Sequence, residues 1–169
     1  MNKGFTILEA IAAIFVMTVG VLGAYAVVQQ IIVYNSISSS RLTAAYLAQE
    51  GIEIVRNIRD TNWVEGVASS WYEGLTGCAS GYEADYDDTD LSCWSDPGRF
   101  LELQAGGFYS YDSGTQPKFK RKITIFDATD LSSPSDGTPD MFKVKVEVLW
   151  TEKGKDYTVA VEEHLYNWR

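Results

Sequence analysis

The strongest constraint on this chain is an uncharged stretch of 31 residues, Ala10–Ser40. Its first part, Ala10–Val28, is almost entirely apolar and reaches the roughly 20 residues that a helix needs to cross a bilayer. Backbone polar groups in lipid must bond to one another, which a helix achieves within a single segment. A secretory signal peptide has an apolar core of only about 7–15 residues before its cleavage site. The stretch therefore predicts a membrane helix that stays in the protein.

Charge is distributed unevenly on the two sides of this stretch. Lys3 precedes it and the next base is Arg41, which predicts a cytoplasmic N-terminus and an external C-terminal part by the positive-inside rule. The chain carries 14 basic and 23 acidic side chains, and its whole excess of −9 lies after residue 60. Such an acidic domain argues against nucleic-acid binding, which needs Lys and Arg at the phosphates. One histidine and two cysteines leave few groups for a metal centre or a catalytic dyad, so we expect a protein that is not an enzyme.

A short motif, GFTILE at residues 4–9, lies directly ahead of the apolar stretch and behind a leader that contains Lys3. Its Glu9 lies at the edge of the apolar run, where an ionised carboxylate is costly unless it reaches the interface or has a cationic partner. Together with the long apolar helix, the motif resembles the type IV pilin-like signal. That family includes major and minor pilins, the pseudopilins of type II secretion and competence pilins. The resemblance is strongest over residues 1–60.

The resemblance implies how the chain is processed and assembled. In the family a prepilin peptidase cuts after the glycine and the new terminal residue is N-methylated, which here means removal of residues 1–4 by cleavage between Gly4 and Phe5. The amine of Phe5 on one subunit would then pair with Glu9 of a neighbour, and such a pair favours one axial register. The implied partners are other pilin subunits in a homo- or heteropolymer, the peptidase, the pilus assembly platform and the membrane. The protein would be held in the cytoplasmic membrane by a single span and then enter an extracellular fibre.

A helical pattern continues beyond the membrane-spanning stretch. Apolar residues recur at three- and four-residue steps as far as Ile58, which predicts an amphipathic helix. We therefore expect one helix, with residues 5–34 in the membrane or the fibre core and residues 35–60 as its amphipathic continuation. Gly20 and Gly23 in the apolar part indicate either close helix packing or local unwinding.

Residues 61–98 show little periodicity and predict a long connection rich in acidic and aromatic residues. Cys78 and Cys93 lie within it and enclose fourteen residues; in an exported region they are expected to form a disulfide. The acids inside this loop suit either a solvated surface or a calcium site that is not an EF-hand. The calcium ligands would be Asp85, Asp87, Asp88 and Asp90. Residues 127–140 form a second loop that faintly resembles pseudopilin calcium loops.

Residues 99–169 predict an antiparallel β-sheet. Apolar and polar residues alternate from Phe142 to Trp150, which is the period of a half-buried strand. Lys153-Gly154 predicts a tight turn into a second strand at residues 157–161. Shorter runs at residues 99–104, 108–111 and 119–126 would extend the sheet. The expected fold class is α+β, a long N-terminal helix packed on a C-terminal antiparallel sheet in a pilin-like arrangement.

The one basic cluster lies at the start of the last of these runs and just before it, and comprises Lys118, Lys120, Arg121 and Lys122. Two interpretations stay open for it, a solvated strand face and a contact with the acidic loop of a neighbouring subunit. The lone His164, beside two glutamates, is expected to be a surface residue of a strand.

These observations predict a structural subunit of a type IV pilus or a related fibre, processed by prepilin peptidase and assembled through its N-terminal helix. A pseudopilin of a type II secretion-like system is the alternative within the family. A third hypothesis is a single-pass anchored extracellular binding protein whose acidic aromatic loop captures a ligand.

Overall fold

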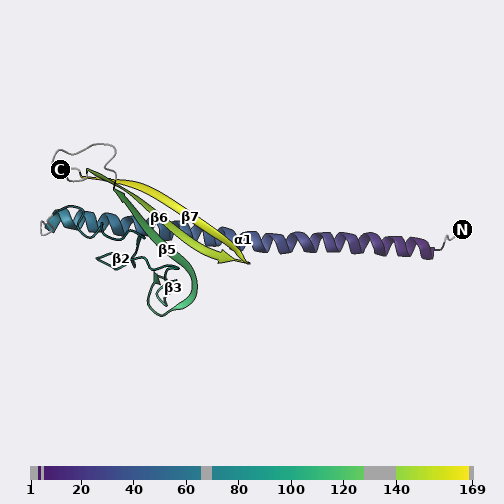
Figure 1. The fold of residues 1–169 in the computed structure, drawn as a ribbon. Helices are drawn as coiled ribbons and strands as arrows, with labels where there is room; N and C mark the ends of the chain where they lie inside the picture. The colour runs from purple at the N-terminus through teal and green to yellow at the C-terminus, as the bar shows by residue number, and fades with distance from the viewer. Residues whose placement is uncertain (1–3, 5, 66–69, 128–139, 168–169) are drawn as a thin grey trace. The chain divides into compact units, whose positions relative to one another are not determined.

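The computed structural model describes residues 4, 6–65, 70–127 and 140–167 (Figure 1). Its contacts divide the chain into two compact units, Met1–Ser40 and Arg41–Arg169. One helix, α1 (Ile7–Glu65), contributes to both units, and the seven strands of the described residues belong to the second. The fold class is α+β, as the sequence predicts.

The helix begins at a cap provided by Thr6. The backbone N–H of Glu9 donates to the Thr6 hydroxyl (3.3 Å), and the N–H groups of Glu9 and Ala10 both donate to the Thr6 carbonyl (3.1 Å). A threonine in this position satisfies donors that a helix otherwise leaves unpaired at its start. Glu9 lies in this first turn, where the helix dipole favours a negative charge.

The helix ends at Glu65 rather than near residue 60, where the sequence predicts its end. The apolar period stops at Ile58, but the turns after it still have tertiary contacts. The side-chain amide of Asn62 donates to the carbonyls of Trp71 (3.3 Å) and Glu73 (2.9 Å). Such contacts between distant residues extend the helix beyond its apolar stripe, and local periodicity does not reveal them.

In the second unit, the amphipathic part of α1 packs on one face of the sheet. The close approach depends on Gly51, because a Cβ atom there would lie only 2.8 Å from Cγ1 of Val146. The predicted amphipathic helix is confirmed, since its apolar residues share one core with those of the sheet. Members of this core are Ala44, Leu47, Ala48, Ile52, Val55 and Ile58 of the helix and Ile123, Val144, Val146 and Val148 of the sheet.

The sheet is antiparallel throughout. Its long strands are β5 (Thr115–Asp127), β6 (Met141–Glu152) and β7 (Lys155–Tyr166), drawn from green to yellow in Figure 1. β6 pairs with β5 on one side and with β7 on the other. Lys153 and Gly154, between β6 and β7, have φ angles of 51° and 75°, which suit a two-residue hairpin turn. The predicted hairpin is therefore confirmed, with strands longer than the sequence indicates.

Four short strands occupy the other edge of β5. β1 (Tyr82–Glu83) pairs with β2 (Ser92–Cys93) and with β5, and β3 (Leu101–Leu103) pairs with β4 (Tyr109–Ser110) and with β5. β3 and β4 fall within predicted strand runs. β1 and β2 correct the prediction that their segment lacks regular structure. The second predicted calcium loop lies almost wholly outside the described residues.

Candidate functional site

The first unit is the candidate membrane and assembly segment. In the part of the chain that the structure describes, α1 is the one helix long and apolar enough to cross a membrane, with a mean hydropathy of 2.4 over its most apolar window. Every described side chain from Thr6 to Ile32 is exposed. A helix that is apolar on all sides is stable in lipid or among other apolar helices rather than in water. The unit therefore requires an apolar environment that the described residues do not supply.

The predicted processing motif lies at the start of this unit. Gly4 is exposed, whereas Phe5 lies outside the described residues, so the predicted pairing of its amine with Glu9 stays a prediction. The side chain of Glu9 is exposed. The helix cap engages Glu9 through its backbone N–H and not through its carboxylate.

Gly20 and Gly23 lie within an unbroken helix. Apart from the adjacent residues and the helix's own backbone, no atom of the described residues lies within 4 Å of the position that a Cβ would occupy at either glycine. This geometry agrees with close packing of a second helix on the small residues. Local unwinding stays a prediction.

Cys78 and Cys93 form a disulfide, with their Cα atoms 5.5 Å apart. The predicted pairing is thus present in the structure. Cys93 belongs to β2 and lies opposite Tyr82 of β1, so the disulfide and the short β1–β2 ladder close the same loop. The acidic segment lies inside this loop.

Two of the four predicted calcium ligands hold the acidic loop in shape. Asp85 is buried; its Oδ1 accepts the backbone N–H of Tyr86 (2.7 Å) and its Oδ2 accepts that of Tyr111 (2.9 Å). The Oδ2 of Asp88 accepts the N–H of Asp85 (2.5 Å). These carboxylates bond to backbone donors, as in many tight turns. The segment is therefore a defined turn anchored to the chain after β4.

The other two predicted ligands, Asp87 and Asp90, are exposed. Among the described residues, no three His, Cys, Asp or Glu side chains are placed to hold a metal ion together. The calcium site stays a prediction. Beside it, the rings of Tyr86 and Phe108 stack with centroids 5.3 Å apart, and both are exposed.

The basic cluster of β5 does not form one solvated face. Arg121 is fully buried, while its neighbours in the strand are partly exposed. Its guanidinium donates to the carboxylate of Glu50 (2.7 Å), to the carbonyl of Leu47 (3.1 Å) and to the carbonyl of Ala84. Arg121 therefore joins α1, the acidic loop and β5. The prediction of a solvated strand face is wrong for this residue.

The alternation of inward- and outward-facing residues along the strand distinguishes Arg121 from the lysines. Phe119 and Ile123 are inward-facing residues of the core, and Arg121 lies between them at the same period of two. Lys118, Lys120 and Lys122 occupy the alternate positions, on the outer face of the sheet. His164 is exposed on β7, as predicted.

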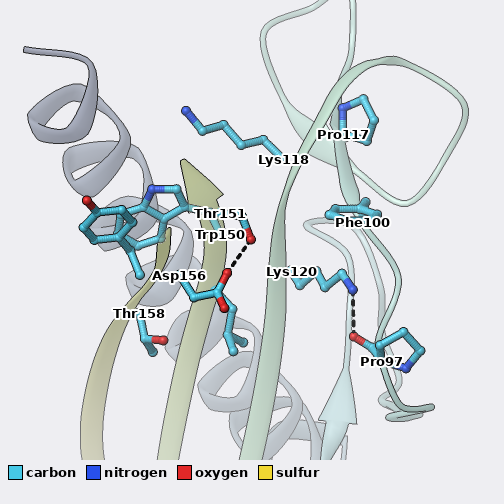
Figure 2. Close-up of a pocket in the computed structure, with 11 residues that line it drawn as sticks. Pro97, Phe100, Pro117, Lys118, Lys120, Trp150, Thr151, Asp156 and Thr158 are labelled. Atoms are coloured by element: carbon cyan, nitrogen blue, oxygen red, sulfur yellow. Dashed lines mark hydrogen bonds between the residues drawn. The ribbon is translucent and has the colours of Figure 1, made fainter. Parts of the chain in front are cut away.

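A cavity of about 430 Å³ lies on this outer face, between the end of the β6–β7 hairpin and the chain around Phe100 (Figure 2). Lys120 reaches the chain around Phe100, where its Nζ donates to the carbonyl of Pro97 (3.0 Å) and lies 4.4 Å from the centre of the Phe100 ring. On the other wall, the hydroxyl of Thr151 donates to Asp156 (2.6 Å). The cavity combines lysine side chains and the carboxylate of Asp156 with apolar walls.

The described residues define an α+β chain with one candidate membrane helix and a disulfide-bonded sheet unit. Comparisons with protein-family models, with curated proteins and with solved structures find no match for this chain. Its function is therefore argued from its own residues.

Proposed function

We propose that this chain is a structural, non-catalytic subunit of a type IV pilus or a related fibre, held in the membrane by α1 until assembly. The observation that carries the proposal is the GFTILE motif of residues 4–9 directly ahead of a helix whose described side chains are exposed as far as Ile32. Lipid satisfies such a helix before assembly, and a bundle of identical helices satisfies it afterwards. One segment can then serve both as an anchor and as the core of a fibre.

Glu9 gives the helix bundle its specificity in this proposal. Cleavage after Gly4 creates an amine at Phe5, and this amine on one subunit pairs with the carboxylate of Glu9 on its neighbour. In a low-dielectric bundle, a carboxylate without a cation is strongly destabilising, whereas a paired one is acceptable in a single register. The pair therefore sets the axial step of the fibre more than its overall stability.

The substitution Glu9→Ala tests this role. Membrane insertion should be unaffected, because removal of a charge eases insertion. The helix cap should persist, since Thr6 bonds the backbone and not the carboxylate. The ratio of fibre-associated to membrane-associated subunit should fall by about tenfold or more, because the neighbour's amine is left without an anion.

Control variants separate charge from helix polarity in this measurement. Gln29→Ala removes an exposed polar side chain from the same helix and should leave the ratio unchanged. Glu9→Val should behave as Glu9→Ala does, and Glu9→Asp should retain part of the ratio. An unchanged ratio for Glu9→Ala would show that Glu9 is only an interfacial residue.

Processing provides a second test. In cells that contain the peptidase, intact mass should show loss of residues 1–4 and gain of one methyl group, which places N-methyl-Phe5 at the terminus. A chain that keeps Met1 in such cells contradicts the proposal.

The exposed Tyr86–Phe108 stack beside the acidic turn favours an anchored binding protein as the second candidate. Such a protein would stay in the membrane fraction and be absent from sheared filaments. A pseudopilin would instead be processed in the same way without forming long surface fibres. Mass spectrometry of filament and membrane fractions distinguishes the three.

A further inference from the structure

The cavity of about 430 Å³ at the end of the β6–β7 hairpin, here called the hairpin cavity, borders the point where β5 leaves β6. The pairs between these two strands end at Phe119 opposite Trp150, and the first residues of β5 pair with β3 instead (Figure 1). Gln116 has a φ of 55°, which is rare outside glycine, and Pro117 has no N–H with which to pair. Rare backbone conformations of this kind cluster at ligand sites and switch regions.

One wall of the hairpin cavity is apolar and open to solvent. Phe100 and Leu149 are 45% and 38% exposed, which is high for large apolar side chains, and Pro97 and Pro117 line the same space (Figure 2). The volume lies within the range of about 300–1,000 Å³ that is usual for small-molecule sites. The exposed surface of the Phe100 ring can therefore receive a flat hydrocarbon surface of a ligand.

The polar groups of the hairpin cavity carry both signs of charge, and each is held in place. The ammonium group of Lys118 donates to the carboxylate of Glu152 (3.2 Å), and that of Lys120 donates to a backbone carbonyl (3.0 Å). The Oδ1 of Asp156 accepts the hydroxyl of Thr151 (2.6 Å). Because Glu152 compensates Lys118, and Lys120 and Asp156 have opposite charges, the cavity has no excess of either sign. Its lining does not select a charged ligand.

Hydrogen-bonding capacity nevertheless remains in the cavity. An ammonium group has three N–H donors, and Lys120 uses one of them on the carbonyl of Pro97. The Oδ2 of Asp156 and the hydroxyl of Thr158 have no hydrogen bond to the described residues. A purely apolar ligand would exclude water from these groups without replacing its hydrogen bonds, which is unfavourable. The cavity therefore suits a neutral ligand that both donates and accepts hydrogen bonds.

We infer that the hairpin cavity binds a neutral sugar in its pyranose form. A pyranose ring has a C–H surface on its face and hydroxyl groups around its edge that both donate and accept. The C–H surface lies on Phe100, one hydroxyl donates to Asp156, and another accepts from Lys120. Intramolecular hydrogen bonds already order both charged groups, so little order has to be gained on binding. The inference goes beyond the proposed function and does not depend on assembly of a fibre.

Saturation-transfer difference NMR tests the inference on the full chain in dodecylphosphocholine, a detergent without a sugar headgroup. The probes are the methyl glycosides of glucose, galactose, mannose and N-acetylglucosamine. At least one of them should receive saturation at its ring C–H protons, with a Kd of about 1–10 mM. Methyl glucuronide, which is anionic, should bind no more tightly than methyl glucoside. The inference is overturned if none of the four neutral glycosides receives saturation, or if the glucuronide binds about tenfold more tightly.

Substitutions show whether the sugar occupies the hairpin cavity. Phe100→Ala and Asp156→Ala should each raise the Kd by about tenfold, because the first removes the apolar contact and the second an anionic acceptor. Phe108→Ala is the matched aromatic control, since Phe108 is 56% exposed but does not line the cavity; its Kd should equal that of the unchanged chain. Asp90→Asn is the corresponding acidic control and should also leave the Kd unchanged.

A milder variant keeps the test decisive if a larger substitution disturbs the fold. Thr158→Val removes a hydroxyl group at an exposed position and should raise the Kd by about threefold. Near-UV circular dichroism checks the fold of every variant. An unchanged Kd in the folded variants of Phe100, Asp156 and Thr158 overturns the inference. Loss of binding in Phe108→Ala would place the sugar on the Tyr86–Phe108 stack and overturns it as well.

Discussion

Glu50→Gln removes the anionic partner of Arg121, the most buried charged side chain among the described residues. Arg121 has no exposed side-chain surface, and Glu50 is the only carboxylate with which its guanidinium bonds in the described residues. Removal of one partner from a buried ion pair costs about 3–5 kcal/mol. The side chain of Glu50 is 37% exposed, so water offsets part of the loss, and the glutamine carbonyl can still accept a hydrogen bond. We therefore expect a loss of about 2 kcal/mol in the free energy of unfolding.

The assay is thermal unfolding of the full chain in detergent, followed by near-UV circular dichroism. For a chain of this size, a loss of about 2 kcal/mol lowers Tm by about 4–8 °C. Glu53→Gln is the matched control, because Glu53 lies on the same helix, is 64% exposed and pairs with Arg56; its Tm should change by less than about 2 °C. In an Arg121→Met background, Glu50→Gln should have little effect. Equal Tm values for the two glutamine variants would refute the reasoning.

Two further predictions concern close packing and alkaline pH. Gly51→Ala should lower the free energy of unfolding by about 1–3 kcal/mol, because the new Cβ would lie 2.8 Å from Cγ1 of Val146. Gly20→Ala is the control and should not lower it, because the corresponding position at Gly20 is open. The Tm values of the two variants test this difference. Burial raises the pKa of Tyr111 well above its ordinary value of 10.0, so the folded chain keeps this proton when the unfolded chain has lost it. This difference contributes to the free energy of unfolding below pH 10, and the contribution is lost as the pH rises further, by at most about 1.4 kcal/mol per pH unit. Between about pH 9 and about pH 11, Tm should therefore fall less in Tyr111→Phe than in the unchanged chain.

The parts of the fold that the sequence predicts are those with a local period. The apolar stretch, the amphipathic helix and the β6–β7 hairpin each repeat over many residues, and the structure contains all three. The turn at Lys153-Gly154 is predictable for a related reason, since few dipeptides suit two consecutive positive φ angles. The local sequence pattern is enough to predict these elements, because their tertiary packing favours the same secondary structure.

The parts that the sequence does not predict depend on contacts between distant residues. β1 and β2 contain two residues each, which is too short for a period, and β1 joins β5 through the pair Tyr82 and Ile123. The sequence does not reveal that the buried carboxylate of Asp85 accepts a hydrogen bond from the backbone N–H of Tyr111, because the two residues are distant in sequence. Composition alone groups Arg121 with the neighbouring lysines, although the period of the strand places it in the core.

Arg121 also links the helix to the acidic turn. Its guanidinium bonds to Glu50 on α1 and to the carbonyl of Ala84, and the next residue, Asp85, anchors the acidic turn. The buried ion pair and the disulfide together order this turn in the free chain. The helix, the acidic turn and the central strand of the sheet are thus joined through one charge in the core.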